Sequence, residues 1–341
     1  MHLMNNKTAF SMLLSHVISE GRGEVLYGNY IDKVKKCVPN LLGEGPFPDI
    51  YLECPLLGTP FLDVVIVFEK SAKSGGSKSP LVPDLDLILD SFSRIMERYP
   101  EVNGGFEVDT GSFESEVAGI HFQPRAHIEL VEGFCETIGE ASYGRLYEEM
   151  ARRLKGLWAP EYFGILRGRP GAPLRVAGYI GKREMLSYAK DPERIIRVFE
   201  AAGFTAFDDA MIEQICSVFK ASPGTSDFQF DIYPDGSTGE TFSLSALHNI
   251  RRRQETLNTF YAGDDADYIN LLTDWGIADE RWKKVVDTVF NGTIPMKGGS
   301  IAFLAFPQAF KVRWKGKRLQ PAKAYVMAKA VEINDQNHIL K

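Results

Sequence analysis

The sequence has few cysteines, and their spacing does not suggest a metal site. Only four occur in 341 residues, at Cys37, Cys54, Cys135 and Cys216, and no two of them form a CxxC pair. Structural zinc sites and small disulfide frameworks need closely spaced cysteines. We therefore expect four free, buried thiols in a protein of a reducing compartment.

The sequence also lacks long apolar runs and an excess of positive charge. No apolar stretch reaches the roughly 20 residues of a transmembrane helix, and the N-terminal MHLMNNKTAFSMLL shows no signal-peptide pattern. With 39 Lys and Arg against 45 Asp and Glu, the net charge of −6 gives no overall attraction to nucleic acid or anionic membranes. We expect a cytoplasmic monomer that binds neither. A phosphate-bearing ligand would then need a local cluster of cations.

What the sequence does contain is a recurring order of helical stretch and strand pair. Helical spacing over 7–41, 84–98, 127–154, 191–220 and 248–290 alternates with five pairs of strand-like segments. The clearest helix is KDPERIIRVFEAAGF, which we expect Asp191 to cap and Gly203 to end. The units share no sequence identity, so only the pattern repeats.

The strand pairs are separated by short turns, which predicts hairpins and an antiparallel sheet. DIYLECPL and FLDVVIVFE flank a Gly-Thr-Pro turn, and SDFQFDIY and TFSLSAL flank PDGSTG. About ten such strands, with helices covering one face, predict an α+β fold. A sheet of this length is expected to close into a ten-stranded antiparallel barrel ringed by helices, as a single domain over 1–341.

The two faces of the predicted strands differ in character. In SDFQFDIY, Phe228, Phe230 and Ile232 share one face, while Asp227 and Gln229 share the other. This alternation also fits an open sheet with one solvated face. The polar face, however, is rich in Tyr, Gln, Ser and Arg, which favours a lumen that binds a ligand.

Cations gather on the polar face of the third and fifth hairpins. We expect too few acids at neighbouring lumen positions to pair with all of them, and a diphosphate would supply the missing negative charge. Any one of these cations, taken alone, also fits an ordinary surface charge. Tyr179, Tyr233 and Tyr325 are expected beside the cluster, where aromatic faces stabilise a carbocation and exclude water. The predicted diphosphate-binding cations are Arg167, Arg169, Arg175, Lys311, Arg313 and Lys323.

This pattern resembles the soluble aromatic prenyltransferases of the ABBA or PT-barrel type. In that family, repeated α-α-β-β units place ten antiparallel strands around a lumen. The stretch AKAYV, with Lys323 and Tyr325, resembles a Lys-x-Tyr motif that binds diphosphate and shields the allylic cation. PLRVAGYI resembles another such strand, with Arg175 in a basic position and Tyr179 in a shielding one. The resemblance covers the whole chain by pattern, through short motifs.

Two adjacent strands resemble different branches of that family. DIYLECPL is similar to the first strand of the indole-prenylating branch, which implies that Glu53 takes the proton from the acceptor. FLDVVIVF is similar to the bacterial phenol-prenylating branch, which implies that Asp63 holds Mg²⁺. GGFEVDT lacks the diphosphate Lys of that branch. The resemblance therefore implies either no cofactor or Mg²⁺.

The implied reaction transfers an allylic group from dimethylallyl, geranyl or farnesyl diphosphate to an aromatic small molecule or peptide side chain, as in secondary metabolism. Arg and Lys would stabilise the leaving diphosphate. Glu53 would be the general base, with Glu107 or His121 as substitutes. Glu53 also fits a structural carboxylate paired with a lumen Arg, and His121 a hydrogen-bonded barrel histidine. The implied acceptor pocket comprises Glu107, His121, Gln123, Gln229 and Ser243.

Two other classes of function remain open from the sequence. One is a barrel that binds a small or peptide ligand in a biosynthetic pathway without catalysis. The other is a guanidino-modifying enzyme, whose fold also repeats five times. That chemistry needs a nucleophilic Cys beside a His, and Cys216 on a helix and Cys54 on an apolar strand face do not suit it.

Overall fold

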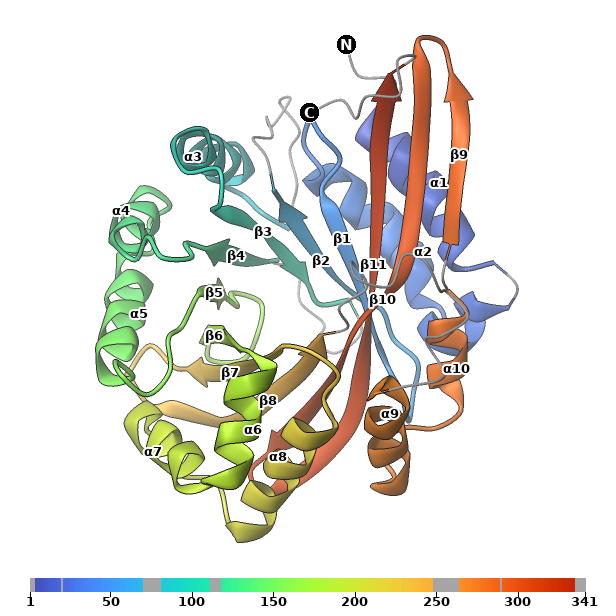
Figure 1. Cartoon of the computed structure of the whole chain (residues 1–341). Helices are drawn as coiled ribbons and strands as arrows, with labels where there is room; N and C mark the ends of the chain where they lie inside the picture. The colour runs from blue at the N-terminus through green and yellow to red at the C-terminus, as the bar shows by residue number, and fades with distance from the viewer. Residues whose placement is uncertain are drawn as a thin grey trace.

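Helices and antiparallel strand pairs alternate along the chain in the structure, a computed structural model (Figure 1). It describes residues 4–19, 21–69, 81–110, 118–247, 264–288 and 290–334. The helical elements are α1 (Asn6–Val17), η1 (Gly23–Tyr27), α2 (Tyr30–Cys37), η2 (Val38–Leu41), α3 (Leu85–Arg98), α4 (Glu129–Thr137), α5 (Ala141–Arg153), α6 (Lys182–Lys190), α7 (Glu193–Ala202), α8 (Asp209–Ala221), α9 (Asp264–Asp274) and α10 (Arg281–Val286).

The strands form one antiparallel sheet that closes on itself. Its order is β11-β1-β2-β3-β4-β5-β6-β7-β8-β10-β9, and β10 also pairs with β11, so ten strands complete a ring. The predicted ten-stranded barrel is confirmed, and the open sheet is wrong because the last strand pairs with the first. The strands are β1 (Asp49–Pro55), β2 (Asp63–Phe68), β3 (Asn103–Val108), β4 (Gly119–Gln123), β5 (Tyr162–Ile165), β6 (Leu174–Ile180), β7 (Ser226–Ile232), β8 (Thr238–Leu247), β9 (Phe290–Met296), β10 (Gly299–Lys315) and β11 (Arg318–Asn334).

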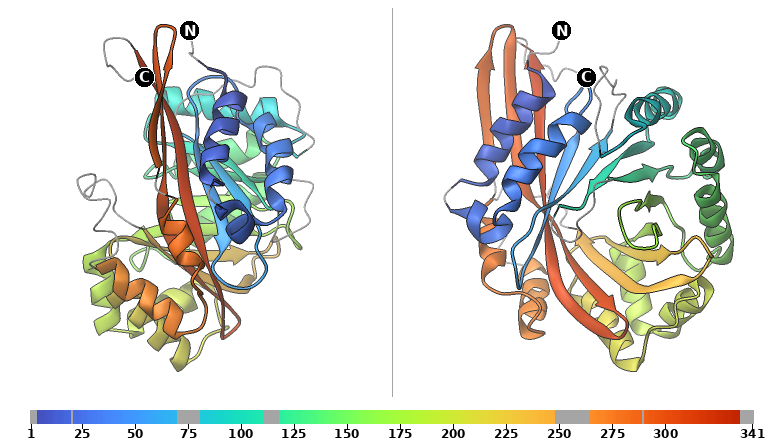
Figure 2. Two further views of the ribbon diagram at one scale, coloured as in Figure 1. Left: turned by 90° about the vertical axis from the view of Figure 1, so that its right-hand side faces the viewer. Right: turned by 180° about the vertical axis from the view of Figure 1, so that it is seen from behind.

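The apolar core lies between the outer face of the barrel and the helices around it (Figure 2). Phe228, Phe230 and Phe242 are fully buried on that outer face, as the alternation of SDFQFDIY predicts. Phe199 of α7 packs edge-on against two of them, with ring centroids 5.9 Å from Phe230 and 4.9 Å from Phe242. The opposite, polar face of the same strands is therefore left to line the lumen.

The ends of the helices show which local predictions hold. Gly203, with φ of 75°, ends α7, and the Asp208 side chain caps α8 by accepting a hydrogen bond from Met211 N at 3.0 Å. The predicted cap at Asp191 is wrong. Its backbone N–H donates to Ser187 O at 3.1 Å, so Asp191 ends α6, and α7 begins after Pro192.

The C-terminal strands differ most from the prediction. SIAFLAF and AFKVRWK form one long strand, β10, with a register shift between Pro307 and Ala309. No strand was predicted before SIAFLAF, and the structure has one there: β9 lies at the edge of the sheet, where its Pro295 is tolerated. The outer parts of β9, β10 and β11 extend beyond the ring as a three-stranded sheet (Figure 1). Of the predicted helical region 248–290, residues 248–263 lie outside the described part of the chain.

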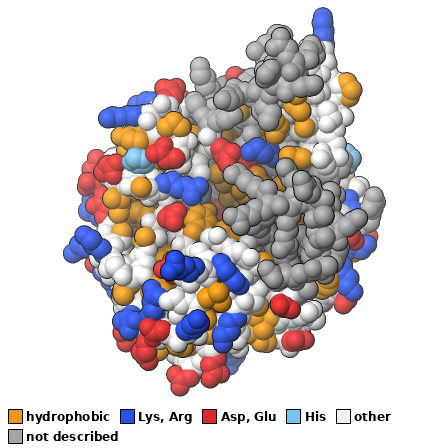
Figure 3. Space-filling view, in the orientation of Figure 1, with side chains coloured by type: hydrophobic (Ala, Val, Ile, Leu, Met, Phe, Trp, Pro, Cys, Tyr) orange, Lys and Arg blue, Asp and Glu red, His pale blue; other side chains and the backbone are white. Residues whose placement is uncertain are grey.

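The described surface carries mixed charge. Lys and Arg are interspersed with Asp and Glu on the face shown in Figure 3, consistent with the small net charge of −6. Across the described residues, no helix combines the length and apolar character needed to cross a membrane.

Candidate active site

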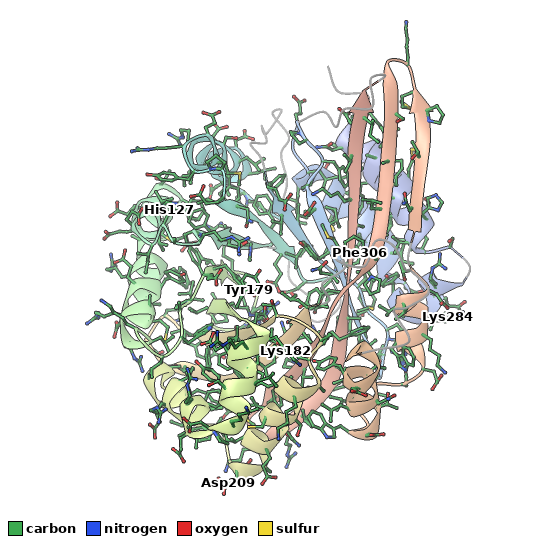
Figure 4. All side chains as sticks on the ribbon, viewed as in Figure 1. His127, Tyr179, Lys182, Asp209, Lys284 and Phe306 are labelled. Atoms are coloured by element: carbon green, nitrogen blue, oxygen red, sulfur yellow. The ribbon has the colours of Figure 1, made fainter. Side chains whose placement is uncertain are left out.

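The barrel contains a cavity of about 220 Å³. Tyr179 marks its position inside the ring of strands in Figure 4. Glu69 and Arg125 are exposed and lie at its open end, whereas Lys311 is buried. Eight of the predicted site residues line the cavity: Glu107, His121, Gln123, Arg175, Tyr179, Gln229, Lys311 and Tyr325.

The other predicted residues do not line the cavity. Most are on lumen-facing strand positions or in adjoining turns. They influence the cavity through their charges and through ion pairs with other lumen residues. Ser243, for example, is buried on β8 opposite Gln229 and Arg313. The full set is Glu53, Asp63, Arg167, Arg169, Arg313, Lys323, Tyr233 and Ser243.

Arg169 is held by two carboxylates at the end of β3. Its Nε and Nη2 donate to the Asp109 oxygens at 2.8 and 2.7 Å, and Nη2 also pairs with Glu107. Such a bidentate contact fixes a guanidinium strongly. Arg169 is therefore already neutralised before any ligand binds.

Arg175 of β6 shares the same carboxylate. Its Nε and Nη2 donate to the two oxygens of Asp231 at 3.0 and 3.3 Å, and Nη1 lies 3.4 Å from Glu107 Oε1. Burial would raise the pKa of Glu107, but Arg169 and Arg175 outweigh it and lower that pKa to about 2. Glu107 is therefore an ionised bridge between two arginines.

Lys323 joins the last strand to the first. Its Nζ pairs with Glu53 and lies 3.9 Å from Asp63 Oδ2. Burial would raise the pKa of Glu53, but the charges of Lys323 and Lys311 hold it well below its usual range. Glu53 therefore fits the alternative of a structural carboxylate in an ion pair. The partner expected from the sequence was an arginine, and in the structure it is Lys323.

Asp63 does not fit the metal site implied by the resemblance. Its Oδ1 accepts a hydrogen bond from Thr110 N at 2.8 Å, and its other oxygen faces Lys323. The described residues include no group of three His, Cys, Asp or Glu side chains arranged to hold a metal ion. We therefore derive no step through Mg²⁺.

The expectation that lumen acids are too few is wrong as stated. Carboxylates on the lumen side are at least as numerous as cations, because Glu107 and Asp109 both serve Arg169, and Glu53 and Asp63 both face Lys323. The strand alternation did not reveal this uneven distribution. The lumen carboxylates are Glu53, Asp63, Glu107, Asp109, Asp227 and Asp231.

Two lumen cations lack a carboxylate partner in the described residues. Lys311 Nζ donates to Gln229 Oε1 at 2.6 Å and lies 3.3 Å from the Tyr325 hydroxyl, both of which are neutral. Burial and the charge of Arg175 lower the pKa of Lys311 to about 7. Arg313, two residues further along the same face of β10, has a buried Nε without a hydrogen-bond partner, and burial lowers its pKa. These two groups carry positive charge that could bind an anionic ligand.

Two predicted lumen positions lie elsewhere. β5 ends at Ile165, so strand alternation does not extend to Arg167, and its Nε donates to Glu140 Oε1 at 2.7 Å, ahead of α5. Arg167 is therefore not part of the lumen cluster. Tyr233 follows the end of β7 and is half-buried against Gly171, in the turn between β5 and β6, and Gly239, at the start of β8, so it packs at the rim.

A buried carboxylate organises the wall of the cavity. Asp227 Oδ1 accepts from Ser245 N at 2.9 Å, and Oδ2 accepts from Gln229 Nε2 at 2.7 Å and from the Tyr162 hydroxyl. Because its Nε2 faces Asp227, Gln229 presents Oε1 to Lys311. Asp227 thus fixes both an aromatic ring and the amide that holds Lys311.

Aromatic rings form one side of the cavity. The Tyr162 ring lies 5.5 Å from Tyr179 and 5.2 Å from His121, measured between centroids. Burial raises the pKa of Tyr179 to about 12, so its hydroxyl stays neutral. Tyr325 lines another part of the cavity, beside Lys311. The ring of Tyr325 therefore lies near Lys311, as predicted, whereas the cation beside the Tyr179 ring is Arg125 of a neighbouring turn.

His121 is the cavity group best placed to take up a proton without breaking an ion pair. Burial lowers its pKa to about 4, against the opposing charge of Glu107, so the ring is neutral at pH 7. No hydrogen bond to its ring nitrogens occurs within the described residues. Both roles considered from the sequence for His121, the barrel histidine and the general base, stay predictions.

Sequence reasoning missed several residues of this site. Tyr162 could have been found, because it alternates with Gly164 on the lumen side of β5. The hub role of Asp227 depends on hydrogen bonds between strands, and Arg125 enters the cavity lining from a turn. Neither has a local sequence signal.

Comparison with known proteins identifies the fold. No protein-family model and no curated protein matches the sequence. Among solved structures, the apo form of the prenyltransferase PriB aligns with a TM-score of 0.51 at 10% identity, over 96% of each chain. PriB in ternary complex with L-tryptophan and dimethylallyl thiolodiphosphate (TM-score 0.48, 11% identity, 96% of each chain) and NotF in complex with brevianamide F and the same analogue (0.45, 11%, 94% of each) also align. The chain therefore has the PT-barrel fold, the ten-stranded barrel ringed by helices that PriB shares.

Proposed function

We propose that the chain is an aromatic prenyltransferase, which transfers an allylic group from a prenyl diphosphate to an aromatic acceptor in the lumen. The observation that carries this proposal is the pair of unpaired cations, Lys311 and Arg313, near the tyrosines of the cavity. A buried cation without an anionic partner is costly unless a ligand supplies one. That PriB, a prenyltransferase, shares the fold adds support.

In the proposed reaction, the bond between the first prenyl carbon and the diphosphate oxygen breaks, and both electrons leave with the diphosphate. Lys311 and Arg313, with Arg175 beside them, stabilise the charge that develops on the leaving group. The faces of Tyr179 and Tyr325 stabilise the allylic cation. A carbon of the acceptor ring then donates an electron pair to form the new carbon–carbon bond.

The acceptor carbon must finally lose a proton. Glu53 can take it only if Lys323 moves to the diphosphate, because their ion pair holds the carboxylate in its ionised, weakly basic form. Glu107 is likewise held by two arginines. We therefore assign the proton to the neutral ring of His121, with Glu53 as the alternative.

The test is product formation by the purified protein. Incubation with dimethylallyl, geranyl or farnesyl diphosphate and a pool of phenols, indoles and aromatic peptides should give a mass gain of one prenyl group. The Lys311→Met/Arg313→Gln double variant should lose the product. Lys315→Met, an exposed lysine on the same strand, is the matched control and should keep it. No prenylated product with any acceptor would refute the proposal.

A barrel that binds its ligand without catalysis is the second candidate. It is favoured by the lumen carboxylates, which already neutralise Arg169, Arg175 and Lys323. Such a protein would bind inorganic pyrophosphate or an aromatic ligand in calorimetry and yet form no product in the mass measurement. The two experiments together separate the candidates.

A further inference from the structure

Asp227 and Lys311 carry two buried, opposite charges that do not meet directly. Each residue is only 4% exposed, and neither forms an ion pair in the part of the chain that the structure describes. A buried charge is costly unless an opposite charge or several hydrogen bonds compensate it. The two charges are therefore expected to compensate each other through the group that lies between them.

The strand register places both charges at the same level of the barrel, two strands apart. Asp227 of β7 and Lys311 of β10 both lie opposite Ser245 of the intervening strand β8. Neighbouring strands lie about 4.8 Å apart, so these two backbones are about 10 Å apart. Gln229, two residues further along the same face of β7, reaches both charges with its amide.

The orientation of the Gln229 amide is fixed by the two charges. Its Nε2 donates to Asp227 Oδ2 at 2.7 Å, and its Oε1 accepts from Lys311 Nζ at 2.6 Å. The reverse orientation would set the amide oxygen against a carboxylate and the amide nitrogen against an ammonium group. Ser245 N and the Tyr162 hydroxyl also donate to Asp227, so all three contacts are those that an ionised carboxylate requires. Gln229 therefore links the charges and keeps them apart.

Lys323, a neighbour of Lys311 in the barrel wall, shows what a direct contact does. It lies opposite Lys311 in the register of β10 and β11, and its ammonium group pairs directly with Glu53. A carboxylate in contact with an ammonium group neutralises it and competes with an incoming anion. A neutral amide does neither, so Lys311 keeps its charge for a ligand.

The charges around Lys311 decide whether it is protonated. Burial lowers its pKa most and Arg175 lowers it further, whereas Glu53 and Asp227 raise it. Of the two acids, Glu53 is already paired with Lys323, so Asp227 is the carboxylate whose charge remains for Lys311. The described charged and titratable groups around Lys311 are Glu53 of β1, Glu107 of β3, Arg175 of β6, Asp227 of β7, Arg313 of β10, and Lys323 and Tyr325 of β11.

We propose that Asp227 and Gln229 are positioning residues for Lys311, which keep its ammonium group charged and directed into the cavity without neutralising it. Asp227 supplies the attraction that favours the charged form, and Gln229 supplies the spacing that leaves the charge available. This inference rests on the proposed function, because Lys311 is the cation assigned there to the diphosphate.

Calorimetry of inorganic pyrophosphate at acidic and alkaline pH tests the inference without prenyl transfer. Asp227→Asn removes the charge and keeps an acceptor for the Gln229 amide. Lys311 should then lose its proton at lower pH, so the affinity should fall by about tenfold at about pH 8 and by less than about twofold at about pH 5.5. The titration of pyrophosphate itself cancels, because variant and wild type are compared at the same pH.

Gln229→Met tests the spacing. Without the amide, the Lys311 ammonium group should pair directly with Asp227, and an incoming anion must then displace a carboxylate. The affinity for pyrophosphate should therefore fall by about tenfold at the acidic pH as well, where the loss of charge alone has little effect. The two variants thus differ in their pH dependence, which a purely structural role would leave unchanged.

The matched control is Gln214→Met. Gln214 of α8 lies outside the barrel, and its Oε1 likewise accepts a hydrogen bond from a β10 side chain, Trp314 Nε1, at 2.9 Å. This variant should also lose stability, and it should keep the wild-type affinity at every pH.

Three outcomes would overturn the inference. They are the wild-type pH dependence in Asp227→Asn, the wild-type affinity at acidic pH in Gln229→Met, and the absence of pyrophosphate binding by the wild-type protein. Either variant suffices if the other does not fold. If the binding results are as expected and no prenylated product forms, only the proposed reaction is refuted.

Discussion

Lys323 on β11 and Glu53 on β1 form a buried ion pair across the seam at which the barrel closes. Their side chains are only 8% and 7% exposed, and Asp63 lies 3.9 Å from the same ammonium. A buried charge that loses its partner is far more costly than a buried pair. The stability of the seam should therefore depend on the pair as a unit.

We predict that Lys323→Met and Glu53→Gln each lower the free energy of unfolding by about 3 kcal/mol. Each single variant leaves one buried charge of the pair without its main partner, whereas the double variant removes both charges. The double variant should therefore lose much less than the sum of the single losses, as measured by urea unfolding in a double-mutant cycle. Additive losses would show that the two residues do not act as a pair.

His121 predicts how stability changes with pH. Burial lowers its folded-state pKa from 6.5 to about 4, so between these values the unfolded chain binds a proton that the folded protein does not. The contribution of His121 to the free energy of unfolding is therefore fully present above pH 6.5 and is lost as the pH falls toward 4. The loss should be about 1–3 kcal/mol, since the ring faces a cavity and is not wholly desolvated.

The variant His121→Gln isolates that contribution. Its unfolding free energy should fall less steeply than that of the wild type between pH 6.5 and pH 4. Hydrogen bonds to Glu101 and Glu129 raise the pKa of His127, so its contribution to the unfolding free energy changes with pH in the opposite direction. Because His127 is present in both proteins, this contribution is the same in each. Identical pH profiles for the two proteins would contradict the placement of His121.

The barrel was predictable because period-two alternation is a local property of the chain. A helix-covered face must be apolar, so Phe228 and Phe230 fix the direction of β7, and Asp227 and Gln229 follow on the other face. The closure of the ring followed from the number of hairpins. Strand β9 was not predicted, and it can contain Pro295 because an edge strand does not need the backbone N–H that proline lacks.

The pairing inside the lumen could not be read in the same way. Alternation places Arg175 and Glu107 toward one space, but it does not reach Arg169 in the turn after β5, and it does not state which charges meet across strands that are far apart in sequence. The prediction therefore treated every cation as equally free. Only the three-dimensional arrangement separates paired arginines from Lys311 and Arg313.

The Asp227 hub supplies the next prediction. Asp227→Asn replaces an acceptor of three hydrogen bonds by a group with one acceptor and one donor end, which then faces the donors of Gln229 or Ser245. We expect a loss of about 2 kcal/mol in unfolding free energy. Tyr162→Phe removes one donor only and should cost less. Equal losses, measured by urea unfolding, would show that the hub has no special role.

Lys311 predicts proton uptake when an anion binds. Burial and Arg175 hold its pKa at about 7, so it is about half protonated at pH 7. A bound pyrophosphate would raise that pKa, and the complex would take up about half a proton. Calorimetry of inorganic pyrophosphate in two buffers of different ionisation enthalpy measures this uptake. Lys311→Met should bind with less uptake, and equal uptake in both proteins would refute the assignment.

The strongest test of the site is a change that should stabilise the protein while it weakens binding. Arg313 buries its Nε without a partner in the described chain, so it costs stability in the absence of a ligand. Arg313→Met should raise the unfolding free energy by about 1 kcal/mol and should lower the affinity for inorganic pyrophosphate by about tenfold or more.

The matched control for Arg313 is the paired arginine beside it. Arg175→Met leaves Asp231 and Glu107 without one of their cations, so it should destabilise the protein by about 3 kcal/mol. If Arg313 binds a ligand and Arg175 belongs to the structural ion pairs, the two variants should change the free energy of unfolding in opposite directions. Urea unfolding without ligand measures both changes. If Arg313→Met destabilises the protein as much as Arg175→Met does, the unpaired cation has a structural role, and the diphosphate site must be sought elsewhere in the lumen.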